Sequence, residues 1–169
     1  YSAGRSLWCE HILGSFNTSL RFQPRISGSE WADRYGYIPH GTGAEAGPVT
    51  LYGYQRGLLD AMCDPTIPHV TVLKSARVGY TRCATLATGY HLHHDPTLCV
   101  IAQPTIPDAE DFGASEIGPM LRDTPVLSEL MRPLRKGERQ DKATFYQLKN
   151  GATVRLVGAA SDDAFRRYS

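Results

Sequence analysis

Short runs of apolar residues alternate along this chain with segments in which apolar positions recur at helical spacing. Residues 70–73 and 98–102 form two such runs, on either side of the helix-compatible stretch 82–90. Runs of this length, bounded by polar or turn-forming residues, favour strands. Strand, loop, helix and strand in this order imply a parallel βαβ unit. The pattern therefore predicts an α/β fold with a parallel sheet covered by helices.

A hairpin is predicted near the C-terminus. Residues 144–148 and 152–157 have strand-like composition and flank Lys149, Asn150 and Gly151. The Asn-Gly pair is a strong turn signal, because both residues accept the positive φ angles of a tight hairpin turn. We therefore expect two antiparallel strands here.

Local signals predict the remaining elements. Ser27 and Glu30 have the spacing of a capping box, which opens a short helix. Residues 41–48 are rich in glycine and poor in apolar residues, so they predict a loop. Helices are expected where apolar positions have helical spacing, at residues 7–16, 31–35, 109–121 with an interruption at Gly118–Pro119, and 126–131.

Residues 74–81 read Lys-Ser-Ala-Arg-Val-Gly-Tyr-Thr and lie between the first apolar run and the helix-compatible stretch. A phosphate-binding loop would have this position. Against the Walker pattern G-x-x-x-x-G-K-[ST], Gly79 and Thr81 occupy their expected places. Tyr80 stands in the lysine position, and Lys74 stands in the first glycine position. Because an ordinary strand-turn-helix unit has a similar pattern, the loop alone leaves both interpretations open.

Every part of a phosphate cradle is present in this loop. Such a cradle needs backbone N–H groups at a helix N-terminus, a glycine at the turn, a hydroxyl for Mg²⁺ and a long cation. Lys74 can reach the β- and γ-phosphates, and Thr81 supplies the hydroxyl. Arg77 is predicted to neutralise or sense the γ-phosphate; its alternative is an exposed loop charge. Arg82 is a second candidate cation, because Tyr80 has no charge. The predicted cradle consists of Lys74, Ser75, Ala76, Arg77, Val78, Gly79, Tyr80, Thr81 and Arg82, with Lys74 and Arg77 as catalytic residues.

Two residues upstream of the loop are placed at the adenine base. Gln55 can donate and accept hydrogen bonds at an adenine edge, and Tyr54 can cover the ring. Both open an amphipathic stretch that ends about a dozen residues before the loop. The alternative for Tyr54 is an aromatic residue of the core.

Four segments together carry a resemblance to a known family. Glu30–Asp33, Tyr54–Arg56, Lys74–Thr81 and Gln103–Thr105 are similar in kind and order to motifs of the ATPase domain of the lambda-type (GpA family) phage terminase large subunit. The resemblance covers the chain from about Ser27 to its end. The displaced lysine is itself a feature of that family, so it strengthens this specific match.

The resemblance implies a fold and a function. The fold is a P-loop NTPase with a RecA-like parallel sheet. The parent protein would be an ATP hydrolase that packages double-stranded DNA into procapsids, with an endonuclease elsewhere in its sequence. ATP and Mg²⁺ are the implied cofactors. The implied partners are double-stranded DNA, a terminase small subunit, the portal of the procapsid and further copies in a homo-oligomeric motor. The expected compartment is the cytoplasm of the infected host cell, without membrane association.

The resemblance also predicts that this chain is a truncated piece. We expect residues 1–40 to form an N-terminal helical lead-in and residues 41–169 to form part of the ATPase domain. A family member would continue after Ser169 into a strand ending in the Walker B carboxylates, which hold Mg²⁺. Glu110–Asp111 and Asp162–Asp163 are adjacent acidic pairs, but neither follows a strand-like segment. The fragment alone is therefore expected to be inactive, with Walker B and the nuclease absent.

Two alternatives stay open. A superfamily-2-like helicase or translocase shares the glutamine before the Walker loop and the Pro-Thr after the second strand. A non-catalytic fragment that docks on DNA or on the portal belongs to a different class. Nucleotide binding distinguishes the second alternative from a motor.

Composition excludes only a few classes of function and site. The chain is 41% hydrophobic and 21% charged, with a formal net charge of +1. This balance argues neither for nor against a DNA partner, because a motor can grip the phosphate backbone locally. The four cysteines lack C-x-x-C spacing, which argues against a structural zinc site and a disulfide framework. His91, His93 and His94 are expected to be exposed at a helix end; the alternative is that they bind a metal together with Asp95. No apolar run approaches the ~18 residues of a membrane span.

Overall fold

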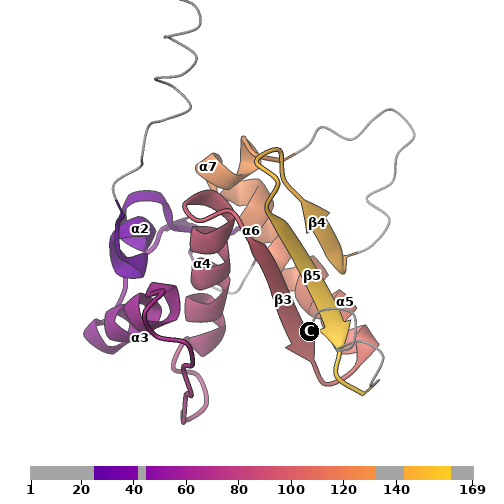
Figure 1. Ribbon diagram of the computed structural model, residues 1–169, viewed down its shortest axis with the longest axis horizontal. Helices are drawn as coiled ribbons and strands as arrows, with labels where there is room; N and C mark the ends of the chain where they lie inside the picture. Colours follow the sequence, from indigo (N-terminus) through magenta and orange to yellow (C-terminus); the bar gives the residue numbers. More distant parts are fainter. Residues whose placement is uncertain (1–24, 42–44, 132–142, 161–169) are drawn as a thin grey trace, which may run out of the picture.

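The computed structural model describes residues 25–41, 45–131 and 143–160. Three helices, α2 (Gly28–Tyr35), α3 (Gly53–Cys63) and α4 (Tyr80–His93), form a helical group beside a small sheet (Figure 1). Helix α4 packs against both α2 and α3, and its other neighbours include strand β3 (Leu98–Gln103). The predicted N-terminal helix at residues 7–16 lies outside the described residues.

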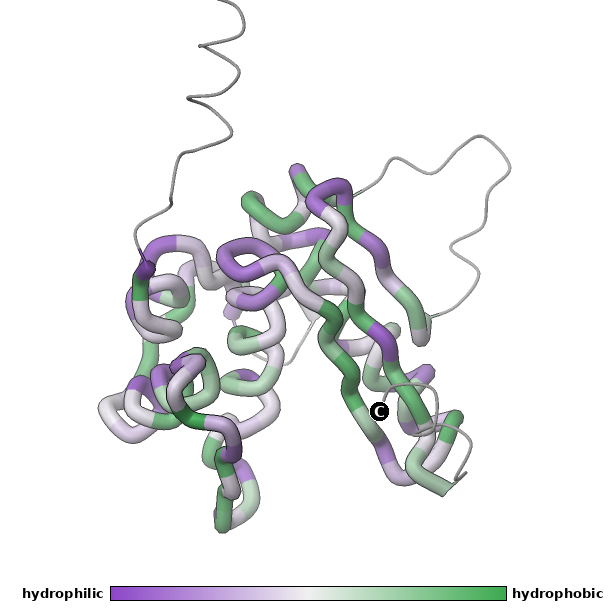
Figure 2. The backbone as a smooth tube through the Cα atoms, viewed as in Figure 1, coloured by the Kyte–Doolittle hydropathy of each residue, from purple (hydrophilic) through white to green (hydrophobic). Residues whose placement is uncertain are grey.

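The sheet combines a parallel and an antiparallel pair. β3 runs parallel to β5 (Thr153–Gly158), and β5 runs antiparallel to β4 (Phe145–Gln147), in the order β3-β5-β4. Gly151, at the turn between β4 and β5, has φ +89°. Most of β3 is hydrophobic (Figure 2). The strand at residues 98–102 and the C-terminal hairpin are therefore confirmed, within a mixed α/β fold.

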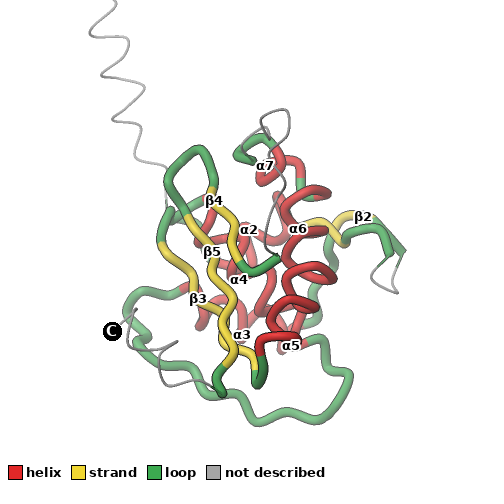
Figure 3. The backbone as a smooth tube through the Cα atoms, turned by 90° about the vertical axis from the view of Figure 1, so that its right-hand side faces the viewer, coloured by secondary structure: helices red, strands yellow, loops and turns green. Residues whose placement is uncertain are grey.

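The predicted strand at residues 70–73 is wrong. In the structure this segment is part of the long loop between α3 and α4, and it has no strand partner in the described part of the chain (Figure 3). Its side chains face solvent: Leu73 is fully exposed and Val70 is 38% exposed. The strand that pairs with β3 is β5, which is distant in sequence. A short apolar run does not form a strand unless a neighbour satisfies its backbone groups.

The segment that follows β3 is helical. α5 (Ile106–Phe112), a π-helical turn (Gly113–Ile117) and α6 (Gly118–Asp123) follow one another directly, and α5 packs on β3 and β5. The predicted interruption at Gly118–Pro119 is therefore confirmed in part: the α-helical pattern is interrupted just before Gly118, by a π-helical turn and not by a break in the helical chain. Proline lacks an N–H and clashes with the carbonyl four residues earlier. The chain just before this proline is π-helical: Gly113 O accepts hydrogen bonds from Gly118 N–H and, at 2.9 Å, from the Tyr146 hydroxyl.

Two short features differ from the predicted loop and helix boundaries. Residues 41–48 include strand β2 (Gly47–Pro48), which pairs with β1 (Tyr37–Ile38). The helix predicted at residues 126–131 is α7 (Pro125–Ser128), and Met131 bridges to Leu148. None of the described helices is long and apolar enough to span a membrane.

The core is centred on Trp31 of α2, which is 1% exposed. Ser27 caps this helix, with its Oγ accepting from Glu30 N–H at 3.2 Å. The predicted helix start is therefore confirmed, but the Glu30 carboxylate pairs with Arg34, so only this half of the predicted capping box is found. Trp31 Nε1 donates to His93 Nδ1 at 3.0 Å, and the indole packs edge-on against Tyr90. These contacts tie α2 to the C-terminal half of α4.

The prediction that the three histidines are exposed is therefore wrong. His91, His93 and His94 are half-buried and pack on aromatic rings. Burial lowers the pKa of His93, and the neighbouring His94 lowers it further. An uncharged imidazole suits this position, because its Nδ1 accepts the indole hydrogen bond. Among the described residues, no cluster of metal-ligating side chains is present.

Cys63, Cys83 and Cys99 are free thiols. Burial raises the pKa of Cys63 to about 12 and the pKa of Cys99 to about 11. Thiols with such values stay protonated at neutral pH, and they behave as small apolar side chains. This agrees with the absence of zinc-ligand spacing among the four cysteines. Cys9 lies outside the described residues.

Candidate functional site

The segment 74–81 forms a tight turn that leads into α4. Gly79 is the N-cap of α4 and has φ +76°, in the left-handed region. Arg77 also has a positive φ, +61°, and it is the only described non-glycine residue that does. A left-handed conformation is unfavourable for a residue with a Cβ and often marks a functional site. The predicted helix start at residue 82 is thus corrected to Tyr80.

The N-terminus of α4 lacks the side chains that commonly accept hydrogen bonds from the first N–H groups of a helix. It has no side-chain cap and no acidic residue in its first turn. The first intrahelical bond joins Cys83 N–H to Gly79 O at 3.1 Å, so the N–H groups of residues 80–82 have no partner within the helix. Free N–H groups and the positive end of the helix dipole favour a bound anion.

Positive charge is concentrated at the same place. Residues 65–94 contain Lys74, Arg77 and Arg82 and no aspartate or glutamate. Lys74 and Arg77 are exposed. Three cations without a nearby acidic partner in sequence give the turn a local positive potential, although the whole chain is nearly neutral. The three cations were predicted from the sequence, and the absence of acidic residues over positions 65–94 was a further signal in it.

Lys74 folds back over the turn toward Tyr80. Its Nζ lies 5.5 Å from the centroid of the Tyr80 ring, within the range of a cation–π contact. Tyr80 stands where the Walker pattern has its lysine. The ammonium group of Lys74 therefore lies beside the residue that stands in the lysine position of the Walker pattern. The catalytic role of Lys74 stays a prediction.

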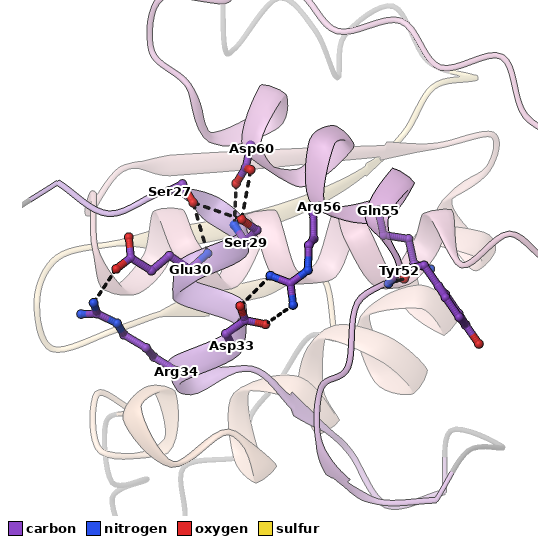
Figure 4. Close-up of polar contacts among 9 residues, drawn as sticks. All are labelled: Ser27, Ser29, Glu30, Asp33, Arg34, Tyr52, Gln55, Arg56 and Asp60. Carbon is purple, nitrogen blue, oxygen red and sulfur yellow. Dashed lines mark hydrogen bonds and ion pairs between the residues drawn. The ribbon is translucent and has the colours of Figure 1, made fainter.

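Tyr54 and Gln55, at the start of α3, lie against the turn. The Tyr54 hydroxyl donates to Val78 O at 3.1 Å, and Gln55 Nε2 donates to the same oxygen at 3.2 Å. Gln55 Oε1 accepts from Tyr52 N–H at 3.0 Å (Figure 4). The structure thus brings both residues to the loop, but the polar atoms of Gln55 contact backbone. Their role at adenine stays a prediction.

One aromatic residue of this region was missed from the sequence. The Tyr52 ring is stacked on that of Tyr54, with centroids 5.9 Å apart and an interplanar angle of 3°. Both rings are largely exposed, at 70% and 59%. The Tyr-x-Tyr spacing at a helix start was the available signal, because alternate residues before a helix can share one side.

The remaining predicted residues occupy the surface of the same turn. Ser75, Ala76 and Thr81 are exposed, and Thr81 is the second residue of α4. A threonine hydroxyl at this position suits Mg²⁺ that is bound mainly by phosphates and water. The metal role of Thr81 stays a prediction.

Other residues of the recognised segments have structural roles. Arg56 binds Asp33 with two hydrogen bonds, of 2.6 and 2.8 Å, which join α3 to α2 (Figure 4). The hydrogen bond from Arg56 lowers the pKa of Asp33. Thr105 Oγ1 caps α5 by accepting from Asp108 N–H at 3.2 Å. The Arg56–Asp33 pair thus holds α3, which carries Tyr54 and Gln55, against α2, and Thr105 starts α5.

Comparisons with known proteins indicate the family to which the chain is similar. The family model described as "Phage terminase large subunit gpA, ATPase domain" matches residues 43–169. The terminase large subunit of Escherichia phage lambda is 31% identical over 158 residues, covering 94% of this chain and 24% of the relative. That of Enterobacteria phage P21 is 29% identical over 140 residues, covering 83% of this chain and 22% of the relative.

The chain spans about a quarter of the length of these curated relatives. No solved structure matches it. The family match covers most of the chain and includes the turn, the start of α4 and the mixed sheet. This chain belongs to the ATPase-domain family of the gpA-type phage terminase large subunit.

Proposed function

We propose that residues 74–81 bind the phosphates of ATP and that this chain is part of the ATPase motor of a phage terminase large subunit. The observation that carries the proposal is the convergence of three features at one turn. The N-terminus of α4 offers N–H groups without a helical partner. Gly79 and Arg77 bend the backbone around that point. Lys74 Nζ lies over the ring of Tyr80, the residue that stands in the lysine position of the Walker pattern.

Within this proposal each residue has a distinct task. The N–H groups from Gly79 onward cradle phosphate oxygens, and Lys74 stabilises the charge of the β- and γ-phosphates. Thr81 would supply its hydroxyl to Mg²⁺, which would neutralise the charge of the phosphates. Arg77 contacts the γ-phosphate, and Arg82 adds a second cation. Ser75, Ala76, Val78 and Tyr80 complete the turn, which takes the form of a P-loop in a RecA-like domain.

The activity of the whole protein is proposed from the family. We infer an ATP hydrolase that drives double-stranded DNA into a procapsid, together with a terminase small subunit, the portal and further copies of itself. An endonuclease would lie elsewhere in the parent protein. The phage relatives support action in the cytoplasm of the infected cell.

The family match favours a packaging motor over the superfamily-2-like translocase. A non-catalytic fragment that docks on DNA or the portal is the second alternative. It predicts no dependence of binding on the number of phosphates, so a nucleotide titration distinguishes it from the motor.

We expect purified protein to bind ATP and ADP more tightly than AMP in the presence of Mg²⁺, because the phosphates make most of the contacts. Lys74→Ala should lower the affinity for ATP by at least about tenfold, as loss of one charge-assisted hydrogen bond contributes about 1.5–3 kcal/mol. Isothermal titration measures both effects. The midpoint of thermal unfolding should stay nearly unchanged, because Lys74 is exposed.

Lys149→Ala is the matched control. Lys149 is an exposed lysine at the hairpin turn, where Nζ donates to Glu129 O. Its removal should leave ATP affinity unchanged. Equal affinities of Lys74→Ala and the parent for ATP, or equal binding of AMP and ATP by the parent, contradict the proposed phosphate site.

A further inference from the structure

We propose that Tyr54 and Gln55 are positioning residues for phosphate: they orient the Val78–Gly79 peptide so that the Gly79 N–H faces the bound anion. This inference rests on the proposed function and adds a task to residues that the sequence placed at the base. The ligand class concerned is the polyphosphate chain itself, with or without a nucleoside.

The first observation is that two side chains donate to one carbonyl oxygen. Tyr54 Oη and Gln55 Nε2 lie 3.1 and 3.2 Å from Val78 O. A carbonyl oxygen has two lone pairs, so both donors can be accepted together. This carbonyl is thus held from the side of α3 by two adjacent residues of that helix.

The second observation is that Gln55 is itself fixed. Its side chain is 7% exposed, and its Oε1 accepts from the Tyr52 backbone at 3.0 Å. This hydrogen bond determines the direction of the amide group, and Nε2 consequently points to Val78 O. A buried amide with both ends engaged in this way is a rigid support.

Peptide geometry converts this support into an orientation for the next N–H. No cis peptide bond is present among the described residues, and in a trans peptide the C=O and N–H point in opposite directions. Because Val78 O points to α3, the N–H of Gly79 points away from α3. The same turn leads directly into the free N–H groups of α4.

The third observation is the close fit between Gly79 and Gln55. A Cβ built on Gly79 would lie 2.5 Å from Gln55 Nε2. Gly79 also has φ +76°, which favours glycine. The absence of a side chain therefore lets the amide of Gln55 reach the carbonyl next to Gly79.

This arrangement predicts an effect on phosphate binding that is independent of the base. We test it by measuring the dissociation constants of ATP, GTP and inorganic tripolyphosphate for the purified protein, in the longest form that its coding sequence provides. Tyr54→Phe keeps the ring and removes only the donor to Val78 O. Gln55→Met keeps the approximate length of the side chain and removes its amide.

Each variant should lower the affinity for all three ligands by about fivefold, as expected for loss of one hydrogen bond. The ratio of ATP to GTP affinity should not change. Tyr37→Phe is the matched control, because it removes a phenolic hydroxyl from a residue of β1 and leaves the bonds to Val78 in place. Its three dissociation constants should equal those of the parent.

Two results would overturn the inference. One is a change in the ATP to GTP ratio with unchanged tripolyphosphate affinity, which identifies base recognition instead. The other is an affinity for all three ligands that is unchanged in both variants, although Lys74→Ala lowers it. In that case phosphate binds at the turn without support from Tyr54 and Gln55. If Lys74→Ala also binds all three ligands like the parent, the proposed phosphate site itself is wrong.

Discussion

Replacing Trp31 by alanine is expected to lower the free energy of unfolding by about 3–5 kcal/mol, the usual cost of truncating a buried large aromatic residue. Trp31 is 1% exposed, and it joins α2 to α4 through its ring contacts and its hydrogen bond to His93. Small domains have total stabilities of only about 5–15 kcal/mol. The helical group that carries the loop should therefore be severely destabilised.

Urea denaturation followed by circular dichroism measures this effect. Trp31→Phe keeps an aromatic ring and loses the indole donor, so it should lower the free energy of unfolding by less than Trp31→Ala does. Tyr52→Ala is the control, because Tyr52 is 70% exposed and its removal should change stability by less than about 0.5 kcal/mol. A loss for Trp31→Ala as small as that for Tyr52→Ala would show that the indole does not organise this core.

Replacing Gly79 by alanine is expected to lower the affinity for ATP by at least about tenfold. A left-handed conformation costs an L-residue roughly 1–2 kcal/mol, and a tenfold change in affinity corresponds to about 1.4 kcal/mol. The new Cβ would also lie 2.5 Å from Gln55 Nε2. The turn must then change its backbone angles, move Gln55 away from Val78, or do both.

Gly57→Ala is the matched control for this substitution. Gly57 is an exposed residue of α3, and a Cβ there would meet no atom within 4 Å. Alanine favours a helix more than glycine does, so this variant should be slightly more stable and bind ATP like the parent. Parent-like ATP affinity of Gly79→Ala would contradict the role of the turn.

The parts of the fold that the sequence predicted correctly are specified by neighbouring residues. The Asn150–Gly151 turn determines the hairpin, and the spacing of Ser27 and Glu30 determines the start of α2. The run at residues 70–73 was misassigned because a strand depends on a partner that the pattern does not reveal. The π-turn before Pro119 depends on a carbonyl that is partly satisfied by Tyr146, which is distant in sequence.

The candidate site was predictable in its composition and less so in its contacts. Walker spacing identified Gly79 and Thr81, and residue chemistry identified Lys74 as the cation. The contact of Lys74 with Tyr80 and the hydrogen bonds on Val78 O arise only when the chain turns at residues 76–79. The exposed histidine patch was wrong because the indole of Trp31 takes one imidazole as its acceptor.

Backbone amide shifts measure the central claim most directly. In ¹⁵N-labelled protein titrated with Mg·ATP and, separately, with inorganic tripolyphosphate, the amide signals of residues 79–82 should show the largest changes with both ligands. These are the N–H groups at the turn and at the free N-terminus of α4. Unchanged signals at residues 79–82, with the largest changes elsewhere or none at all, would contradict a phosphate-binding loop at this turn.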